Sequence, residues 1–407
     1  MKTYFFVLGT NHTLSKIDVV NMLARKGIDF EILEASEEVL LISTSTELDA
    51  KSLINELGSA AKIGEIYGLY DNKSWPDNFL KTDLEEKFGQ SKFGISVYGA
   101  GGKFKQLNEV FYSIKQIAEK LKERQIRGEG RVLSTVAVDK NGLLKEGFEL
   151  VICCGSKGVY VGKTLAIQDY ESYSLRDFGR PARNVKSGMI PPKLAKMMIN
   201  LARKEKESLF LDPFCGDGTI LQELILLGYK NIIGSDLNER AISGAKVNLD
   251  WLFKNFQNIN QKDYCLKIFQ SNVNNLSANI SFKSIDAVVT EPFLGSSDRR
   301  FFKPEQIKKE VNELENLYLK AFLEFKKILK TSGTAVIVFP VFRFYKQFFY
   351  LNILDKMEAI GFKNERFIPE KIKGAELLKL QISNRNSVIY FRPGQSVSRE
   401  IFTFSLR

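Results

Sequence analysis

The sequence predicts an α/β fold in which a parallel sheet with covering helices follows two smaller α+β modules. Three apolar segments in the C-terminal half are predicted strands that each end at an acidic residue, at 209–212, 231–236 and 285–291. The stretches between them are long enough for the crossover helices that parallel strands need. At 407 residues the chain exceeds one comfortable hydrophobic core, so we expect more than one domain.

The N-terminal part alternates short apolar strands with amphipathic helical stretches. Residues 1–70 form a first predicted α+β module, with strands at 4–8, 30–35 and 38–43 and helices at 14–25 and 48–57. Residues 71–170 form a second, with a helix over 107–124 and strands at 93–98, 131–138, 148–154 and 158–165. We therefore expect two compact modules ahead of the main sheet.

Positive charge dominates the chain. Its formal net charge is +11, which favours a polyanionic partner because lysine and arginine attract phosphates through counterion release. Lysine enrichment from genome composition would give the same excess. The helix predicted in the second module is basic, either as a solvated face or as an RNA-facing patch; its cations are Lys115, Lys120, Lys122, Arg124, Arg127 and Arg131.

A segment rich in proline, glycine and positive charge separates the two halves of the chain. Residues 171–187 form this predicted linker, and residues 188–407 the predicted main domain. Pro191 and Pro192 suit a first helical turn, where the missing N–H donors cost little. We expect the main domain to begin with that helix.

The segment that joins the first two strands of the main domain carries the chemistry of a nucleotide cofactor site. Asp212 ends a strand, and the turn that follows contains Gly216 and Gly218, which let a ligand approach the backbone closely. About twenty residues after the turn, Asp236 ends the next strand and is placed to accept hydrogen bonds from ribose hydroxyls. Ordinary buried strands with acids and glycines as turn residues are the alternative explanation.

Glu291, Pro292 and Phe293 follow the third strand and are suited to hold an amino group. An exocyclic amino group on a nucleobase is a poor nucleophile, because its lone pair is delocalised into the ring. A side-chain oxygen and a backbone carbonyl beside the proline can accept hydrogen bonds from such a group and orient it, while the aromatic ring stacks on the base.

Composition argues against several other classes of protein. No run of about eighteen apolar residues is present, and the first nine residues predict a strand rather than a signal peptide, so we expect a cytoplasmic protein with no membrane part. The four cysteines show no Cys-x-x-Cys spacing and His12 is the only histidine, which argues against a metal site.

Four stretches together resemble the motifs of one enzyme family. They are residues 162–169, residues 180–195, residues 212–219 and residues 390–395. The chain resembles the THUMP-domain tRNA guanine-N2 methyltransferases of the guanosine-10 type, which are class I enzymes dependent on S-adenosyl-L-methionine. The resemblance implies a Rossmann-like catalytic domain over 188–407, a THUMP-like RNA-binding module over 71–170 and a ferredoxin-like module over 1–70.

The resemblance also implies a role for each matching residue. Asp212, Gly216 and Gly218 would line the methionine part of the cofactor, and Asp236 its ribose. Asn272 stands where an acid usually contacts the adenine amino group, and its amide oxygen can accept the same bond. Further residues of the implied cofactor site are Phe214, Leu237 and Val273.

Glu291, Pro292 and Phe293 would hold the guanine, but this motif departs from the family. Glu291 replaces the usual Asp or Asn, and Phe293 stands one position earlier than the usual aromatic residue. Two alternatives therefore stay open: a DNA or other RNA amino-methyltransferase, and a catalytically inactive RNA-binding protein. The resemblance implies tRNA as partner; we expect a monomer, with a small activating partner as the alternative.

Overall fold

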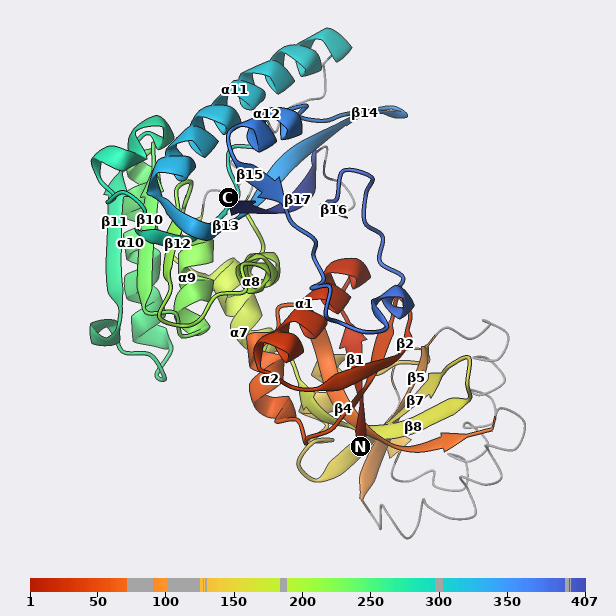
Figure 1. The fold of residues 1–407 in the computed structure, drawn as a ribbon. Helices are drawn as coiled ribbons and strands as arrows, with labels where there is room; N and C mark the ends of the chain where they lie inside the picture. Colours follow the sequence, from red (N-terminus) through yellow and green to blue (C-terminus); the bar gives the residue numbers. More distant parts are fainter. Residues whose placement is uncertain are drawn as a thin grey trace. The chain divides into compact units, whose positions relative to one another are not determined.

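A computed structural model describes residues 1–71, 91–100, 125–126, 128, 130–183, 189–296, 303–391, 395 and 397–407. The chain divides into two compact units. Unit 1 comprises Met1–Ser172 and Ile368–Leu380, and unit 2 comprises Tyr173–Phe367 and Gln381–Arg407 (Figure 1).

Unit 1 is built on one eight-stranded sheet, in the order β2-β3-β1-β4-β8-β7-β5-β6. Its strands are β1 Lys2–Leu8, β2 Phe30–Ala35, β3 Val39–Thr44, β4 Ala60–Tyr70, β5 Lys92–Gly99, β6 Gln125–Ile126, β7 Gly147–Cys154 and β8 Val159–Ile167. Its helices are α1 His12–Arg25, α2 Ala50–Glu56, α6 Thr135–Lys140 and the 3-10 turn η6 Ala375–Leu378.

The sheet of unit 1 crosses the predicted boundary at residue 70. Strand β4 from the first predicted module pairs with β8 from the second, from Lys62 opposite Ile167 to Tyr70 opposite Val159. The two stretches therefore share a sheet and belong to one compact unit, because pairing β4 with β8 satisfies the backbone groups of both edges. Their assignment as ferredoxin-like and THUMP-like parts stays a prediction.

Two further predictions for unit 1 need correction. The strand predicted at 131–138 is wrong, because residues 135–140 form helix α6; Ser134 caps it, its hydroxyl accepting a hydrogen bond from Ala137 N at 3.1 Å. The helix predicted over 107–124 lies outside the described residues, as do all of the cations listed for it except Arg131. Arg131 itself is committed to a structural contact.

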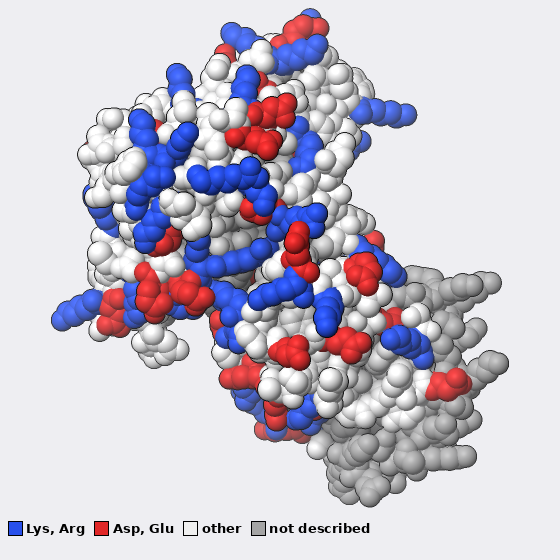
Figure 2. Space-filling view, viewed as in Figure 1, with Lys and Arg blue, Asp and Glu red and all other residues white. Residues whose placement is uncertain are grey.

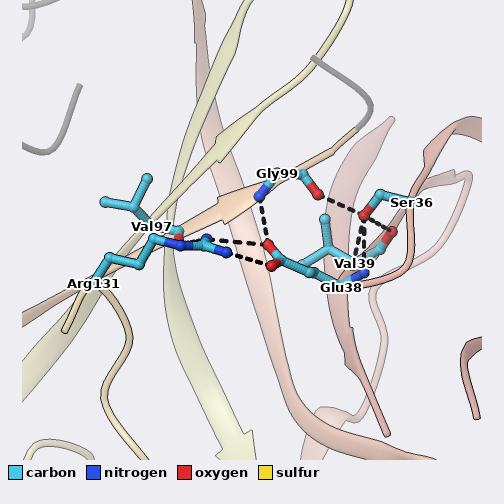
Figure 3. Close-up of polar contacts among 6 residues, drawn as sticks. All are labelled: Ser36, Glu38, Val39, Val97, Gly99 and Arg131. Carbon is cyan, nitrogen blue, oxygen red and sulfur yellow. Dashed lines mark hydrogen bonds and ion pairs between the residues drawn. The ribbon is translucent and has the colours of Figure 1, made fainter. Parts of the chain in front are cut away.

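Figure 3 shows the surroundings of Arg131. Its guanidinium pairs with both carboxylate oxygens of Glu38 and donates to the carbonyl oxygen of Val97 at 2.6 Å. Glu38 also accepts the backbone N–H of Gly99 at 2.7 Å, so the pair joins the β2–β3 turn to the end of β5. Arg131 is therefore not a free cation of an RNA-facing row.

A segment of the predicted main domain belongs to unit 1 instead. Leu378 is fully buried in the core that α1 and α2 form with the sheet, and Ile368, Ile372 and Leu380 pack against it. Lys16 donates from Nζ to the backbone oxygen of Leu378 at 2.8 Å, and burial lowers the pKa of Lys16 to about 8. Burial of these apolar side chains explains why the predicted continuous domain 188–407 is interrupted at 368–380.

Unit 2 contains the doubly wound sheet, in the order β11-β10-β9-β12-β13-β17-β15. Its strands are β9 Leu209–Asp212, β10 Asn231–Asp236, β11 Cys265–Gln270, β12 Ile285–Thr290, β13 Leu329–Phe344, β14 Gln347–Phe349, β15 Phe362–Asn364, β16 Val388–Tyr390 and β17 Val397–Leu406. Strands β9 to β13 pair with one another in parallel, and β17 pairs with β13 in the antiparallel direction.

Helices pack on the sheet of unit 2 in two groups. The helical segments of unit 2 are η2 Leu175–Gly179, α8 Pro192–Leu201, α9 Thr219–Leu226, α10 Glu239–Asn255, η4 Gln261–Asp263, η5 Val273–Ala278, α11 Pro304–Ile328 and α12 Leu354–Ala359, and α7 Tyr170–Ser174 spans the division between the units. Helix α11 shares a core with Leu211, Ile233 and Val288. Because neighbouring strand residues point to opposite faces, Phe210 faces the other group, where it packs on Tyr229.

The predicted secondary structure of unit 2 is largely confirmed. Strands β9 and β10 end where the sequence predicts, and β12 Ile285–Thr290 ends one residue before the predicted Glu291. Helix α8 begins at Pro192 with Pro191 as its N-cap. The carboxyl ends of the parallel strands meet at one edge of the sheet, where ligands bind in open α/β folds. Within the described residues, no helix is long and apolar enough to cross a membrane.

Candidate active site

A cavity of about 790 Å³ lies at the carboxyl edge of β9, β10 and β12, within unit 2. Ten of the eleven predicted site residues line it: Asp212, Phe214, Gly216, Asp236, Leu237, Asn272, Val273, Glu291, Pro292 and Phe293. Gly218 is the exception. The structure therefore brings the two predicted halves of the site, the turn after β9 and the segment after β12, onto one cavity.

The turn after β9 depends on its two glycines. Gly216 has φ +50°, and a Cβ added there would meet nothing within 4 Å, so the backbone faces open space. Gly218 has φ +84°, caps helix α9 and would bring a Cβ within 3.2 Å of Ala245 Cβ. Gly216 thus exposes backbone to a ligand, whereas Gly218 permits the close packing of α9 on α10.

Asp236 is fixed by backbone hydrogen bonds on both carboxylate oxygens. Its Oδ2 accepts the N–H of Gly216 at 3.0 Å, and its Oδ1 accepts the N–H of Asn238 at 2.8 Å. Each oxygen keeps a second lone pair toward the cavity. Leu237, which is 65 % exposed, lies beside it at the lip of the cavity.

Asn272 lies on the same rim, at the start of η5. Its Oδ1 accepts the N–H of Asn274 at 3.0 Å, which fixes the orientation of the amide. Val273 is buried next to it. The amide oxygen keeps one acceptor site, so the predicted contact with an adenine amino group is compatible with this geometry.

Asp212 is the most buried acid of the cavity, with 1 % of its surface exposed. Burial raises the pKa of Asp212 to about 7; hydrogen bonds from Thr290 Oγ1 at 2.6 Å and Phe214 N at 3.2 Å oppose this rise, and the charges of Asp236 and Glu291 add to it. Near neutral pH, this carboxyl therefore exchanges a proton, and a cation bound beside it would favour the ionised form. The sequence did not predict the part played by Thr290.

Glu291 is held by a residue that sequence reasoning missed. Arg399 on β17 donates from Nε to Glu291 Oε2 and from Nη2 to Oε1 at 3.0 Å. The two side chains are 4 % and 8 % exposed, respectively. Although burial alone would lower the pKa of Arg399, the charge of Glu291 holds it above its usual value.

The Arg399–Glu291 pair fixes the carboxylate in one plane. A bidentate guanidinium uses one lone pair of each oxygen and leaves the others. Glu291 lines the cavity, so these remaining lone pairs can accept hydrogen bonds from a ligand. The two residues are 108 positions apart in the sequence, and only the pairing of β17 with β13 brings them together, which is why no local pattern predicted the contact.

The rest of the Glu291-Pro292-Phe293 segment presents an aromatic ring. Pro292 is buried, and Phe293 is 58 % exposed at the cavity. The backbone oxygen of Phe293 accepts the hydroxyl of Tyr318 at 3.3 Å, which ties the segment to α11. Phe293 is thus free to stack on a planar ligand.

Arg180 is a second residue whose place in the site was not predicted. It is 3 % exposed and lines the cavity, with Nη1 donating to Thr219 Oγ1 at 2.6 Å and Nη2 to Met189 Sδ at 3.0 Å. Its Nε is buried with no hydrogen-bond partner among the described residues. Burial lowers the pKa of Arg180. A buried guanidinium with a free donor is suited to bind an anionic ligand group.

Among the described residues, no group of three or more His, Cys, Asp or Glu side chains is arranged to hold a metal ion. The cavity is lined by carboxylates, guanidinium groups, backbone groups and aromatic or apolar side chains.

Comparison with known proteins identifies the domain that carries this cavity. A family model described as "RMKL-like, methyltransferase domain" matches residues 180–363, a range that contains both the Asp212 turn and Glu291. Unit 2 contains a methyltransferase domain. A second model, described as "DNA methylase", matches residues 69–247. The Rossmann-like fold predicted for this methyltransferase domain is confirmed.

Two curated relatives are each named tRNA (guanine(10)-N2)-dimethyltransferase. The protein of Pyrococcus abyssi is 31 % identical over 188 residues, which cover 46 % of this chain and 46 % of the relative. That of Methanothermobacter thermautotrophicus is 24 % identical over 291 residues, covering 70 % of this chain and 75 % of the relative. The chain thus matches about half the length of the first relative.

The whole chain also shares its fold with a solved structure. TrmN from Thermus thermophilus superposes with a TM-score of 0.59 at 13 % identity, and the match covers 100 % of both chains. The likeness is one of fold.

Proposed function

We propose that this protein transfers a methyl group from S-adenosyl-L-methionine to the N2 amino group of a guanosine in tRNA, at position 10. The observation that carries the proposal is that Glu291, Pro292 and Phe293 line the same cavity as the Gly216 turn and Asp236. Residues suited to bind the cofactor and residues suited to hold an amino group thus line one cavity. The names of the two curated relatives support tRNA as the substrate and guanine as the base that is methylated.

The residues of the cavity fit this cofactor. Asp236 offers acceptors for two ribose hydroxyls, and Asn272 and Leu237 provide a polar and an apolar contact for the adenine. The buried Nε of Arg180 has no partner among the described residues and can donate to the carboxylate of the methionine part. Asp212, with a pKa of about 7, can bind the ammonium group of that part in its ionised form. When bound, the cofactor supplies an electrophilic methyl group on a sulfonium.

The chain's own residues act on the guanine by positioning it. Guanine offers two adjacent donors, N1–H and the N2 amino group, which match two carboxylate oxygens; adenine has an acceptor in place of the first. Glu291, held in one plane by Arg399, accepts hydrogen bonds from this edge, and Phe293 stacks on the base. The amino group becomes cationic as the methyl group arrives and then loses a proton, so no strong base is needed beforehand.

One observation supports a second function. The match of residues 69–247 to a DNA methylase model favours a DNA amino-methyltransferase, which would use the same cofactor and the same means of holding an amino group. An inactive RNA-binding protein remains the alternative that the Glu291 departure raises. A monomeric, cytoplasmic protein stays a prediction.

Labelled methyl transfer separates these functions. The full chain is given labelled cofactor with unmodified tRNA transcripts, with duplex DNA and with no nucleic acid, and the products are digested to nucleosides. Label in N2-methylguanosine from tRNA alone supports the proposal. Label in N6-methyladenine from DNA supports the second function, and cofactor binding without transfer supports the inactive protein.

A further inference from the structure

A hairpin at the end of β13 has an unusual composition. Residues 342–350, which we call the aromatic hairpin, have the sequence Phe-Arg-Phe-Tyr-Lys-Gln-Phe-Phe-Tyr, with six aromatic residues, two basic residues and no acid. The end of β13 pairs with β14 from Phe342 opposite Phe349 to Phe344 opposite Gln347, so Tyr345 and Lys346 form a two-residue loop. Figure 1 shows β14 at the outer end of this hairpin.

Only some of these rings stabilise the domain. Phe342 and Phe349 are buried in the core of unit 2, whereas Tyr345 is 82 % exposed and Phe348 is 49 % exposed. The Arg343 guanidinium lies over the Phe348 ring at 5.9 Å, and its Nε donates to the backbone oxygen of Tyr345 at 2.9 Å. Tyr345 meets the Phe344 ring edge-on at 4.8 Å and Phe348 lies 6.5 Å from the Tyr350 ring, yet both keep much of their surface exposed. Two exposed rings and a guanidinium are thus presented on one hairpin.

The backbone conformation of the loop also indicates that the exposed side chains have a role. Tyr345 has φ +52°, a left-handed conformation that glycine adopts freely and that is uncommon for an aromatic residue. A bulky ring at a glycine-type position suggests that the exposed side chain is useful in its own right.

The aromatic hairpin lies at the edge of the sheet that carries the cavity. Thr290, the last residue of β12, pairs with Ile337 in the parallel direction, and Glu291 of the cavity follows directly. Strand β13 continues past this point from Ile337 to Phe344 before the loop. The hairpin therefore extends past the carboxyl end of β12, on the side of the sheet edge where the cavity lies. In Figure 2, drawn in the same view as Figure 1, basic side chains project from this end of the domain.

We infer that the aromatic hairpin binds unpaired nucleotides next to the target guanosine, with Tyr345 and Phe348 stacking on bases and Arg343 and Lys346 contacting phosphates. The inference rests on the proposed function, because it assumes an RNA whose target base has left its stack. Stacking on exposed aromatic rings between cations is how proteins bind single strands without reading their sequence. The excess of positive charge and the lack of acids in the hairpin favour RNA over a protein partner.

The test compares three variants of the full chain. Tyr345→Ala/Phe348→Ala removes both exposed rings, and Arg343→Gln/Lys346→Gln removes both charges. Phe282→Ala is the matched control, since Phe282 is 72 % exposed beside Lys283 and directly precedes β12, at the opposite edge of the sheet from the cavity. Fluorescence anisotropy measures the affinity for a labelled tRNA transcript and for a short single-stranded RNA across a salt series, and thermal unfolding confirms that each variant folds.

We expect Tyr345→Ala/Phe348→Ala, the ring variant, to bind both RNAs at least tenfold more weakly. Arg343→Gln/Lys346→Gln, the charge variant, should reduce the magnitude of the slope of log affinity against log salt by about 1 to 2, since each phosphate contact on a single strand contributes about 0.7 to that slope. Phe282→Ala should bind as wild type does. Cofactor affinity and the rate of transfer at saturating tRNA should stay unchanged in all three, whereas KM for tRNA rises in the two hairpin variants.

Unchanged RNA affinity in the ring variant would overturn the inference. So would a wild-type dimer that the ring variant splits without loss of RNA affinity, because the hairpin would then be an interface between copies. If wild type binds RNA through the hairpin but transfers no methyl group, the inference stands and the proposed function fails, so the two failures are distinguishable.

Discussion

Arg399→Met tests whether the ion pair beneath the cavity controls methyl transfer. Arg399 and Glu291 are 4 % and 8 % exposed and share two charge-assisted hydrogen bonds. Removing the cation leaves a buried carboxylate unpaired, which should lower the free energy of unfolding by about 3–5 kcal/mol. Without its cation, the carboxylate also loses the partner that fixes its plane.

The effect on catalysis follows from the same geometry. A misdirected Glu291 cannot accept hydrogen bonds from the guanine edge, so single-turnover transfer should fall by about 10²–10³-fold, as when one preorganised partner of a reacting group is removed. Cofactor affinity should stay unchanged, because Arg399 does not line the cavity.

A neighbouring ion pair provides the control. Arg385 donates to Glu400, the residue after Arg399, at 2.9 Å, and neither member lines the cavity. Arg385→Met should also lower stability, but transfer per folded molecule should keep its rate. The positioning role is refuted if Arg399→Met retains the wild-type rate, or if both variants lose transfer per folded molecule to the same extent.

Three further predictions address the cofactor site and the interrupted domain. Asp236→Ala should weaken cofactor binding about tenfold or more in calorimetry, because a charge-assisted acceptor is worth about 1.5–3 kcal/mol, whereas exposed Asp250→Ala should not; equal affinities would remove Asp236 from the site. Because the pKa of Asp212 is about 7, cofactor affinity should rise between pH 5.5 and 8 as this carboxyl ionises, and Asp212→Asn should abolish the rise. The raised pKa also means that the contribution of Asp212 to the free energy of unfolding falls as the pH increases from about 4 to 7. Leu378→Ala should cost about 2–5 kcal/mol in urea unfolding, against little for its half-exposed neighbour Leu377→Ala; similar costs would show that segment 368–380 does not stabilise unit 1.

The sequence predicted the parts of the site that are local in the chain. Asp212, Gly216 and Asp236 belong to one strand, turn, helix and strand, so hydrophobic pattern and glycine position were enough to place them. Glu291 was placed in the same way, because the carboxyl ends of parallel strands share an edge.

The missed contacts are those that only tertiary pairing creates. Arg399 reaches Glu291 through the antiparallel addition of β17 to β13, and Arg180 reaches the cavity from the segment ahead of α8. Leu378 joins the core of unit 1 from the far end of the chain. No periodicity in the sequence marks such long-range partners. The wrong strand prediction at residues 131–138 has a local cause instead, because Ser134 is a recognisable helix cap whose effect outweighs the strand propensity of Val136 and Val138.

Mapping the methylated nucleoside in a tRNA transcript tests the central proposal most directly. An unmodified transcript is incubated with the full chain and S-adenosyl-L-methionine, cut by a nuclease, and each fragment is analysed by mass spectrometry, beside a transcript that carries adenosine in place of guanosine 10. The proposal predicts one or two methyl groups on N2 of guanosine 10 and none on the substituted transcript. A methyl group on another base, or none on any tRNA while the cofactor is bound, would contradict it.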